Sequence, residues 1–468
     1  MSRINTNIPS LMAMQQLSKN SANLSTSLQR LSTGLQINSG KDAPAGLIAS
    51  QTLQSEMAGI NQAIANSSSA DNVLSTAEGS LQEVSSLLLE VQSLTTQAAN
   101  SGALSSDEIA ANQLQVDSIL SSINRISNTT QFNGVKLIDG SMDYTTAGVN
   151  PTNFATVNVN SALLVDNAPM NVVVAVTQSA RTGTIGYTGG TLAAGNAVTV
   201  QVAGNKGSQQ VSFAGGTTIA QMITAINAVT GSTGVSAINS GGDLGLYSVA
   251  FGSKQYVSLQ TVSGTFAPTA SIGYGRDANV TVNGAAAQAD GLSVSYRNSN
   301  LDLQLQLGTA FNTVGNDQFQ ITGGGAVFQL GAKVDTQDKA SIGLQSVSTG
   351  SLGNSITGYL STLGSGAANS LSSGNLNTAQ KIIDAAIAQV STLRGRIGAF
   401  QKEVLDPNVS SLNVALENVT ASESSITDTD FAAETANMTR AQILVQATTT
   451  VLAQANSSPQ NVLTLLKG

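Results

Sequence analysis

The chain has 468 residues, which is enough for several domains and a sizeable core. Only 10% of the residues are charged and the net charge is −8, which argues against a general nucleic-acid or anionic-membrane binder. The chain has no His and no Cys, so disulfides, His-based triads, zinc-protease helices and haem–His sites are excluded. No cofactor and no metal site is expected, although a carboxylate or lysine enzyme stays open.

The first residues lack the apolar stretch and cleavage site of a Sec-type signal peptide. No stretch reaches the roughly 18 apolar residues that a membrane-spanning helix needs. We therefore expect a chain that is either cytoplasmic or exported by a route that uses no cleaved signal.

A heptad pattern comes first in the chain, with apolar residues at alternating steps of three and four and one gap at Ser21. Its members are Met14, Leu17, Leu24, Leu28, Leu31 and Leu35. A narrow stripe of this kind is typical of a seam for another helix. The Gly, Asn, Ser and Pro residues between 34 and 46 predict a non-helical connector after it.

Helical periodicity then returns and becomes regular from Leu74 to Ala98. Ser105 and Glu108 form a capping-box pattern, which predicts that a further helix begins there. The dipeptide Asn133-Gly134 predicts a tight turn.

From about 140 to 350 the apolar period changes to two, as half-buried antiparallel strands require. The alternating segments are 157–159, 198–202, 280–282 and 301–307. One helix interrupts them near 219–229, with Thr217 or Thr218 as its cap and Gly231 as its end.

Helical periodicity resumes near Asn377 and stays in register as far as Val404. The stripe then continues from Val409, displaced by one residue, and Pro407 lies at the displacement. Proline removes a helix hydrogen bond and clashes with the preceding turn, so a kink or bulge is predicted there.

A second seam closes the chain, with a gap at Ser458. Its members are Ala441, Leu444, Thr448, Val451, Ala455, Val462 and Leu465. Two terminal seams indicate that the chain pairs its own ends, or those of copies of itself. The predicted fold class is α+β multidomain, with paired terminal helices as a coiled coil and helical rod and a mostly antiparallel β-rich insert.

Both ends also carry sequence motifs that resemble those of bacterial flagellin. At the N-terminus these are residues 3–7, 27–35, 37–39 and 41–47, followed by 130–137; at the C-terminus they are 438–444, 451–456 and 459–463. The segment 217–259 is more loosely similar to the hook-type repeat inserted in such proteins, which places that repeat near 195–300.

The resemblance implies three domains. Residues 1–47 with 425–468 would form an inner coiled-coil tube domain, 48–140 with 326–424 a helical rod domain with a small β-hairpin region, and 141–325 an outer insert. The implied function is a structural, non-enzymatic subunit that self-assembles into the helical flagellar filament for swimming. Type III export would deliver it outside the cell, and the implied partners are other copies, an export chaperone, the filament cap and hook-junction proteins.

Residues Leu88, Val91, Gln92 and Leu94 occupy the stretch that a vertebrate innate-immune receptor recognises in many flagellins. Gln92 stands where that pattern has an arginine, so the five-donor guanidinium is missing. Packing within the rod is the favoured interpretation of the three apolar residues, with weak or absent receptor signalling as the consequence.

Two alternatives stay open from the sequence. The first is a hook–filament junction protein, since such proteins share the N-terminal motifs, although residues 452–456 favour the filament subunit. A flagellin whose insert acts as a surface adhesin is the other. The terminal arms carry little apolar surface and few charges, so we expect them to be disordered in free subunits and to fold on stacking with neighbours.

Overall fold

The computed structural model describes residues 6–100, 102, 104–164 and 168–467, with only the backbone described for 459–467. The chain divides into two units, one of residues 1–68, 330–334 and 406–468 and the other of residues 69–329 and 335–405. The helices are α1 (Ile8–Thr33), α2 (Pro44–Ala98), α3 (Ser106–Thr129), α4 (Ile219–Ala228), α5 (Thr230–Thr233), α6 (Leu376–Phe400), α7 (Asp406–Thr427) and α8 (Phe431–Lys467).

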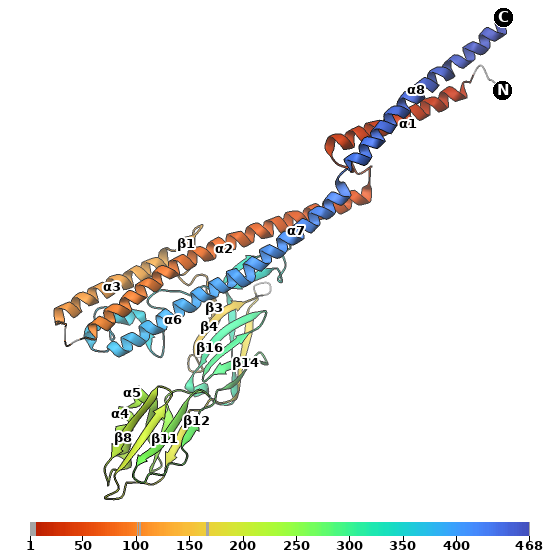
Figure 1. Ribbon diagram of the computed structural model, residues 1–468. Coiled ribbons are helices and arrows are strands. Elements are labelled where there is room, and N and C mark those ends of the chain that lie inside the picture. Colours follow the sequence, from red (N-terminus) through yellow and green to blue (C-terminus); the bar gives the residue numbers. More distant parts are fainter. Residues whose placement is uncertain (1–5, 101, 103, 165–167, 468) are drawn as a thin grey trace. The chain divides into compact units, whose positions relative to one another are not determined.

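The first unit contains α1 and α8, which lie side by side (Figure 1). Asn7 caps the start of α1 by accepting a hydrogen bond from the Ser10 N–H, and Pro9 lies in the first turn. Gly34 ends α1 with φ +76°, a left-handed conformation that glycine adopts without strain. The predicted connector runs from there to Pro44, where α2 begins.

The helical part of the second unit has an apolar core. On α2 the side chains of Leu74, Leu81 and Leu88 are fully buried, and on α6 those of Ile383 and Ile397 are fully buried as well. The Ser105–Glu108 capping box that starts α3 is confirmed. The predicted turn at Asn133-Gly134 joins two short strands, β1 (Gln131–Phe132) and β2 (Val135–Lys136).

The insert, part of the second unit, contains a large antiparallel sheet in the order β3-β17-β5-β13-β14-β15-β16-β4. Its strands are β3 (Tyr144–Ala147), β4 (Phe154–Ala162), β5 (Met170–Gln178), β13 (Asn279–Val282), β14 (Ala285–Asp290), β15 (Ser293–Arg297), β16 (Leu301–Leu307) and β17 (Gly315–Gly324). Phe154 packs edge-on against both Phe311 and Phe319 in its core. The alternation in β4 and β16 predicted these strands correctly.

A second β module with its own core occupies residues 181–275, between β5 and β13. It has one sheet in the order β6-β10-β9 and another in the order β12-β11-β7-β8. Its strands are β6 (Thr184–Tyr187), β7 (Val198–Gly204), β8 (Gly207–Phe213), β9 (Val235–Ser240), β10 (Asp243–Ser248), β11 (Tyr256–Ser263) and β12 (Ile272–Tyr274). Helix α4 lies against β9, capped by Thr218 through a capping box with Gln221.

The predicted end of that helix at Gly231 is wrong. A short helix, α5, follows α4 and includes Gly231, and the left-handed glycine that ends it is Gly234, with φ +74°. The chain enters and leaves the module through adjacent residues. The Arg181 N–H donates to the Arg276 carbonyl at 2.8 Å, and the Arg276 N–H donates back to the Arg181 carbonyl at 2.9 Å.

The return path to α6 is made of short elements. These are β18 (Ala326–Gln329), β19 (Lys339–Ile342), β20 (Gly353–Asn354) and β21 (Gly358–Tyr359), with 3-10 turns at Leu360–Leu363 and Leu371–Ser373. A further 3-10 turn, Thr309–Phe311, lies between β16 and β17 of the insert. The observed architecture, terminal helices around an antiparallel β-rich insert, confirms the predicted α+β multidomain class.

Candidate assembly surfaces

Helices α1 and α8 pair antiparallel, and polar contacts are spread along the pair. Near the start of α1, Asn7 Nδ2 donates to the Ala455 carbonyl at 2.7 Å, and Ser10 Oγ donates to Asn456 Oδ1 at 2.7 Å. Further along, Asn20 Nδ2 donates to the Leu444 carbonyl at 3.4 Å. Near the end of α1, Arg30 Nη1 lies 3.7 Å from Glu434 Oε2.

Small and polar residues, rather than leucines, are buried between these two helices. On α1 the buried positions are Ala13, Asn20 and Ser27, seven residues apart, and on α8 they are Glu434 and Ala441, also seven apart. The predicted seam residues flank this line. Leu17, Leu24, Leu31 and Ala455 are half-buried.

The other predicted seam residues remain exposed in the described chain. The exposed fraction is 48% for Leu28, 38% for Leu35, 42% for Leu444 and 57% for Val451. The side chains of Val462 and Leu465 lie outside the described residues. Further exposed apolar side chains on the same two helices are those of Ile8, Leu11, Met12, Met14, Phe431 and Ile443. The helix pair therefore leaves much of its apolar surface uncovered.

Three of the four residues compared with the receptor-recognised patch are buried. Leu88 and Val91 are fully buried and Leu94 is 7% exposed. Gln92 is partly exposed, and its Nε2 donates to Asp384 Oδ1 on α6 at 3.1 Å. Within one chain, these side chains therefore pack α2 against its neighbours.

Between α6 and α7 the helix is distorted by a π-helical turn, Gln401–Leu405, two residues before Pro407. A π-helix uses i→i+5 hydrogen bonds and so accommodates an extra residue in a helical turn. The apolar spacing from Val404 to Val409 is five residues where a regular stripe has three or four. The π-turn thus absorbs the one-residue displacement of the stripe.

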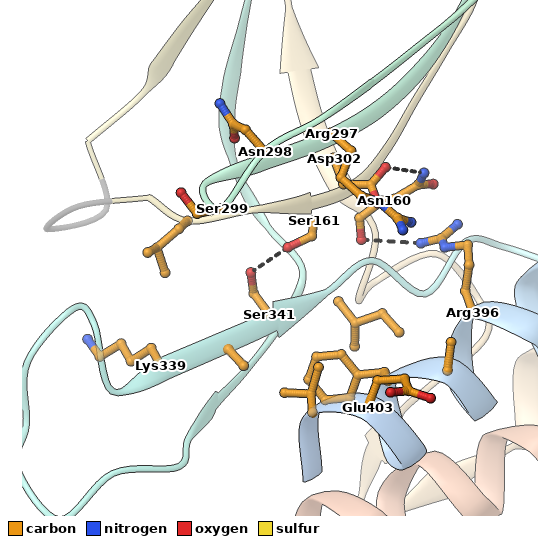
Figure 2. A pocket seen from close by; sticks show the side chains of 16 residues that line it. Asn160, Ser161, Arg297, Asn298, Ser299, Asp302, Lys339, Ser341, Arg396 and Glu403 are labelled. Atoms are coloured by element: carbon orange, nitrogen blue, oxygen red, sulfur yellow. Dashed lines mark hydrogen bonds and ion pairs between the residues drawn. The ribbon is translucent and has the colours of Figure 1, made fainter. Parts of the chain in front are cut away.

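A cavity of about 410 Å³ lies where the insert meets α6, and Figure 2 shows the side chains around it. Arg396 extends from α6, and its Nη2 donates to the Asn160 carbonyl at 3.2 Å and the Gly343 carbonyl at 2.9 Å. Asp302 accepts hydrogen bonds from Asn160 Nδ2 at 2.9 Å and from Arg297 Nε at 2.6 Å. These contacts tie the edge strand β4 to α6.

Burial controls the ionisation of this cluster. It lowers the pKa of Arg396, while Asp302 and Asp143 act in the opposite direction. Burial also raises the pKa of Asp143, which the Tyr144 N–H and Arg396 partly counteract. The Arg396 guanidinium and the Asp302 carboxylate hold the base of the insert through the hydrogen bonds given above.

Within the described ranges, no group of three or more His, Cys, Asp or Glu side chains could hold a metal ion. Among the described helices, none combines the length and apolarity needed to cross a bilayer.

Comparison with known families gives matches at both ends and in the insert. The bacterial flagellin N-terminal helical region matches residues 4–143, the C-terminal helical region matches 380–466, and the flagellin hook IN motif matches 197–250. The last match lies inside the second β module and within the range 195–300 predicted for the repeat.

Full-length relatives agree with these matches. The chain is 32% identical over 525 residues to B-type flagellin of Pseudomonas aeruginosa, with 99% of both chains covered. It is also 32% identical over 501 residues to flagellin of Salmonella typhimurium, again with 99% of both covered. These matches do not favour the junction-protein or adhesin alternatives.

Solved structures superpose only loosely. Flagellar hook associated protein-3 of Legionella pneumophila aligns with a TM-score of 0.31 at 13% identity, covering 80% of this chain and 97% of that one. FliC of Burkholderia pseudomallei aligns with a TM-score of 0.25 at 16% identity, covering 71% and 99%. The sequence matches carry the assignment: the chain belongs to the bacterial flagellins, the structural subunits of the extracellular flagellar filament.

Proposed function

We propose that this subunit polymerises with copies of itself through the apolar faces that α1 and α8 leave exposed. The observation that carries the proposal is the concentration of uncovered large apolar side chains on these two helices, from Ile8 to Leu35 and from Phe431 to Val451. Apolar surface of this extent favours association, and a second copy supplies the same kind of surface. Contacts that repeat without closing produce an open helical polymer.

The three-part division expected from the sequence fits this role. Residues 1–47 with 425–468 would supply the stacking helices, 48–140 with 326–424 the helical rod, and 141–325 the solvent-facing insert. The stacking helices would become fully ordered only when neighbours cover them, because their own pairing buries few large apolar side chains.

Catalysis has no part in the proposed role. The chain lacks His and Cys, and the charged residues at the cavity between the insert and α6, Arg396 and Asp302, hold β4 in place. Partners beyond other copies would be an export chaperone, the filament cap and the hook-junction proteins, which the flagellin family membership supports.

The test is seeded polymerisation of the purified chain, followed by sedimentation and electron microscopy. Placing a charge on each exposed face, with Leu28→Asp and Val451→Asp together, should raise the critical concentration at least tenfold. The control Ser25→Asp with Thr449→Asp adds the same two charges at exposed polar positions of α1 and α8 and should have a much smaller effect.

The far-UV circular dichroism and the urea midpoint of unpolymerised protein should be the same in all three proteins. Normal filaments from the doubly substituted protein would refute the proposed stacking surface. Failure of the unsubstituted chain to form filaments on seeds would refute self-assembly itself.

A further inference from the structure

The α1–α8 pair contains a polar cluster that stacking does not explain. Asn20, Ser27 and Glu434 are buried, with exposed fractions of 3%, 6% and 7%. The side chain of Glu434 is 10% exposed, and Arg30 beside it is 27% exposed. A polar cavity of about 360 Å³ lies alongside, lined in part by Asn23 and Arg440.

Burying such groups lowers the stability of a helix pair relative to apolar packing. Removing a carboxylate from water is unfavourable unless a cation or hydrogen-bond donors compensate. The 3.7 Å ion pair to Arg30 is the polar contact that the described residues provide for the Glu434 carboxylate. Buried polar groups in coiled coils are best known for specifying register and partner.

The rest of the interface specifies register weakly. The central positions repeat every seven residues and are mostly small, Ala13 and Ser27 on α1 and Ala441 on α8. Small residues at every heptad fit equally well after a shift of one heptad. The flanking leucines Leu17, Leu24 and Leu31 repeat at the same interval, so they do not distinguish the shifted pairings either.

The polar cluster does distinguish them. In the observed pairing, facing residues have numbers that sum to about 464, as for Arg30 with Glu434 and Asn20 with Leu444. A shift of one heptad in one direction places Ala441 opposite Arg30. A shift in the other direction places Asn23 opposite Glu434, which leaves the buried carboxylate without its cation.

We infer that Arg30 and Glu434, supported by Asn20, are the residues that fix the register of α1 on α8. They select the one pairing in which the exposed leucines of α1 and α8 lie at fixed positions relative to each other. The inference rests on the proposed stacking function, because misaligned pairs would present a discontinuous surface to the next subunit.

The first experiment is a charge swap measured by seeded polymerisation. Arg30→Glu and Glu434→Arg should each raise the critical concentration at least tenfold, and the double swap Arg30→Glu/Glu434→Arg should return it to within about threefold of the original. Lys19→Glu reverses an exposed charge on α1 and should change the critical concentration much less.

Each outcome decides between the alternatives. If Lys19→Glu acts as strongly as Arg30→Glu, net charge is responsible and the inference fails. If the unsubstituted chain polymerises but the double swap is no better than the single variants, the inference fails while the proposed function stands. A chain that never polymerises overturns the proposed function instead.

The second experiment reads the register directly, in filaments and without reference to critical concentration. The natural chain has no Cys, so one introduced pair can form only one intrachain disulfide. Ser10→Cys with Asn456→Cys replaces side chains that are in hydrogen-bond contact and reports the observed register. Leu17→Cys with Asn456→Cys reports a pairing shifted by one heptad.

In the natural background the first pair should cross-link efficiently and the second poorly. Adding Glu434→Arg should decrease the cross-linking yield of the Ser10→Cys/Asn456→Cys pair and increase that of the Leu17→Cys/Asn456→Cys pair. Adding Arg30→Glu as well should restore the original yields. Unchanged cross-linking in the Glu434→Arg background would overturn the inference. Cross-linked dimers in place of cross-linked monomers would show that the facing helices come from different chains, which would also overturn it.

Discussion

The two helical regions of this flagellin, the rod around α2 and α6 and the terminal pair α1–α8, have similar heptad patterns and different interfaces. In the rod, Leu74, Leu81 and Leu88 are completely buried. In the terminal pair, small and polar residues are central and Leu28 and Val451 remain about half exposed. A stripe of apolar residues therefore does not reveal whether its partner is in the same chain. What distinguishes the regions is how much of the stripe the chain covers by itself.

The largest effect should come from the rod. Leu88→Ala removes a fully buried side chain and should lower the free energy of unfolding by about 2–5 kcal/mol. Leu89→Ala is a matched control on the adjacent position, 53% exposed, and should change it by roughly 0.5 kcal/mol or less. Urea denaturation of unpolymerised protein measures both. Equal effects of the two substitutions would show that the rod interface is as incomplete as the terminal one.

A smaller effect on the free energy of unfolding should come from a carboxylate that links α3 to the segment before α6. Asp117 on α3 accepts hydrogen bonds from Gln113 Nε2 at 2.9 Å, from the Ser365 N–H at 2.9 Å and from the Ser365 hydroxyl. Burial raises the pKa of Asp117, but these hydrogen bonds outweigh it and the pKa is lowered overall. Asp117→Asn should cost about 1 kcal/mol at neutral pH, at the low end because the carboxylate is partly exposed.

The pH dependence gives this prediction a sign. Because the pKa of Asp117 is lowered in the folded chain, its stabilisation is present above the unfolded pKa of about 3.9 and disappears as the pH falls through the lower folded value. Urea midpoints of the original and Asp117→Asn proteins should therefore converge below about pH 4. The control Asp107→Asn, in the first turn of α3, should change the midpoint by less. A constant difference at all pH values would refute the assigned role of the ionised carboxylate.

The smallest effect on stability should come from the π-turn. Deleting Asp406, the exposed residue directly after that turn, shortens the spacing from Val404 to Val409 to four residues and should convert 401–405 to α-helix. The unfolding free energy should change by roughly 1 kcal/mol or less. Pro407→Ala keeps the five-residue spacing and should keep the π-turn. A crystal structure of each variant shows whether the spacing or the proline causes the π-turn. Loss of the π-turn in Pro407→Ala would assign the distortion to proline instead.

Sequence reasoning succeeded where residue type and spacing act locally. The Ser105–Glu108 box, the Asn133-Gly134 turn and the strands 198–202 and 301–307 each follow from a few neighbouring residues. It missed Asn20 and Ser27 because a search for apolar periodicity skips polar residues, even where they are the most buried ones. It merged the two β cores of the insert into one, because strands of both modules alternate in the same way and their separation depends on long-range pairing.

The paired entry and exit of the second β module, at Arg181 and Arg276, have a consequence for how such a chain can change. Strands β5 and β13 are hydrogen-bonded neighbours, so residues 181–275 amount to an enlarged hairpin loop. A loop whose ends already meet can be shortened, lengthened or replaced without moving the strands that carry it. Residues 181–275 can therefore differ in length and surface without any change in how β5 pairs with β13.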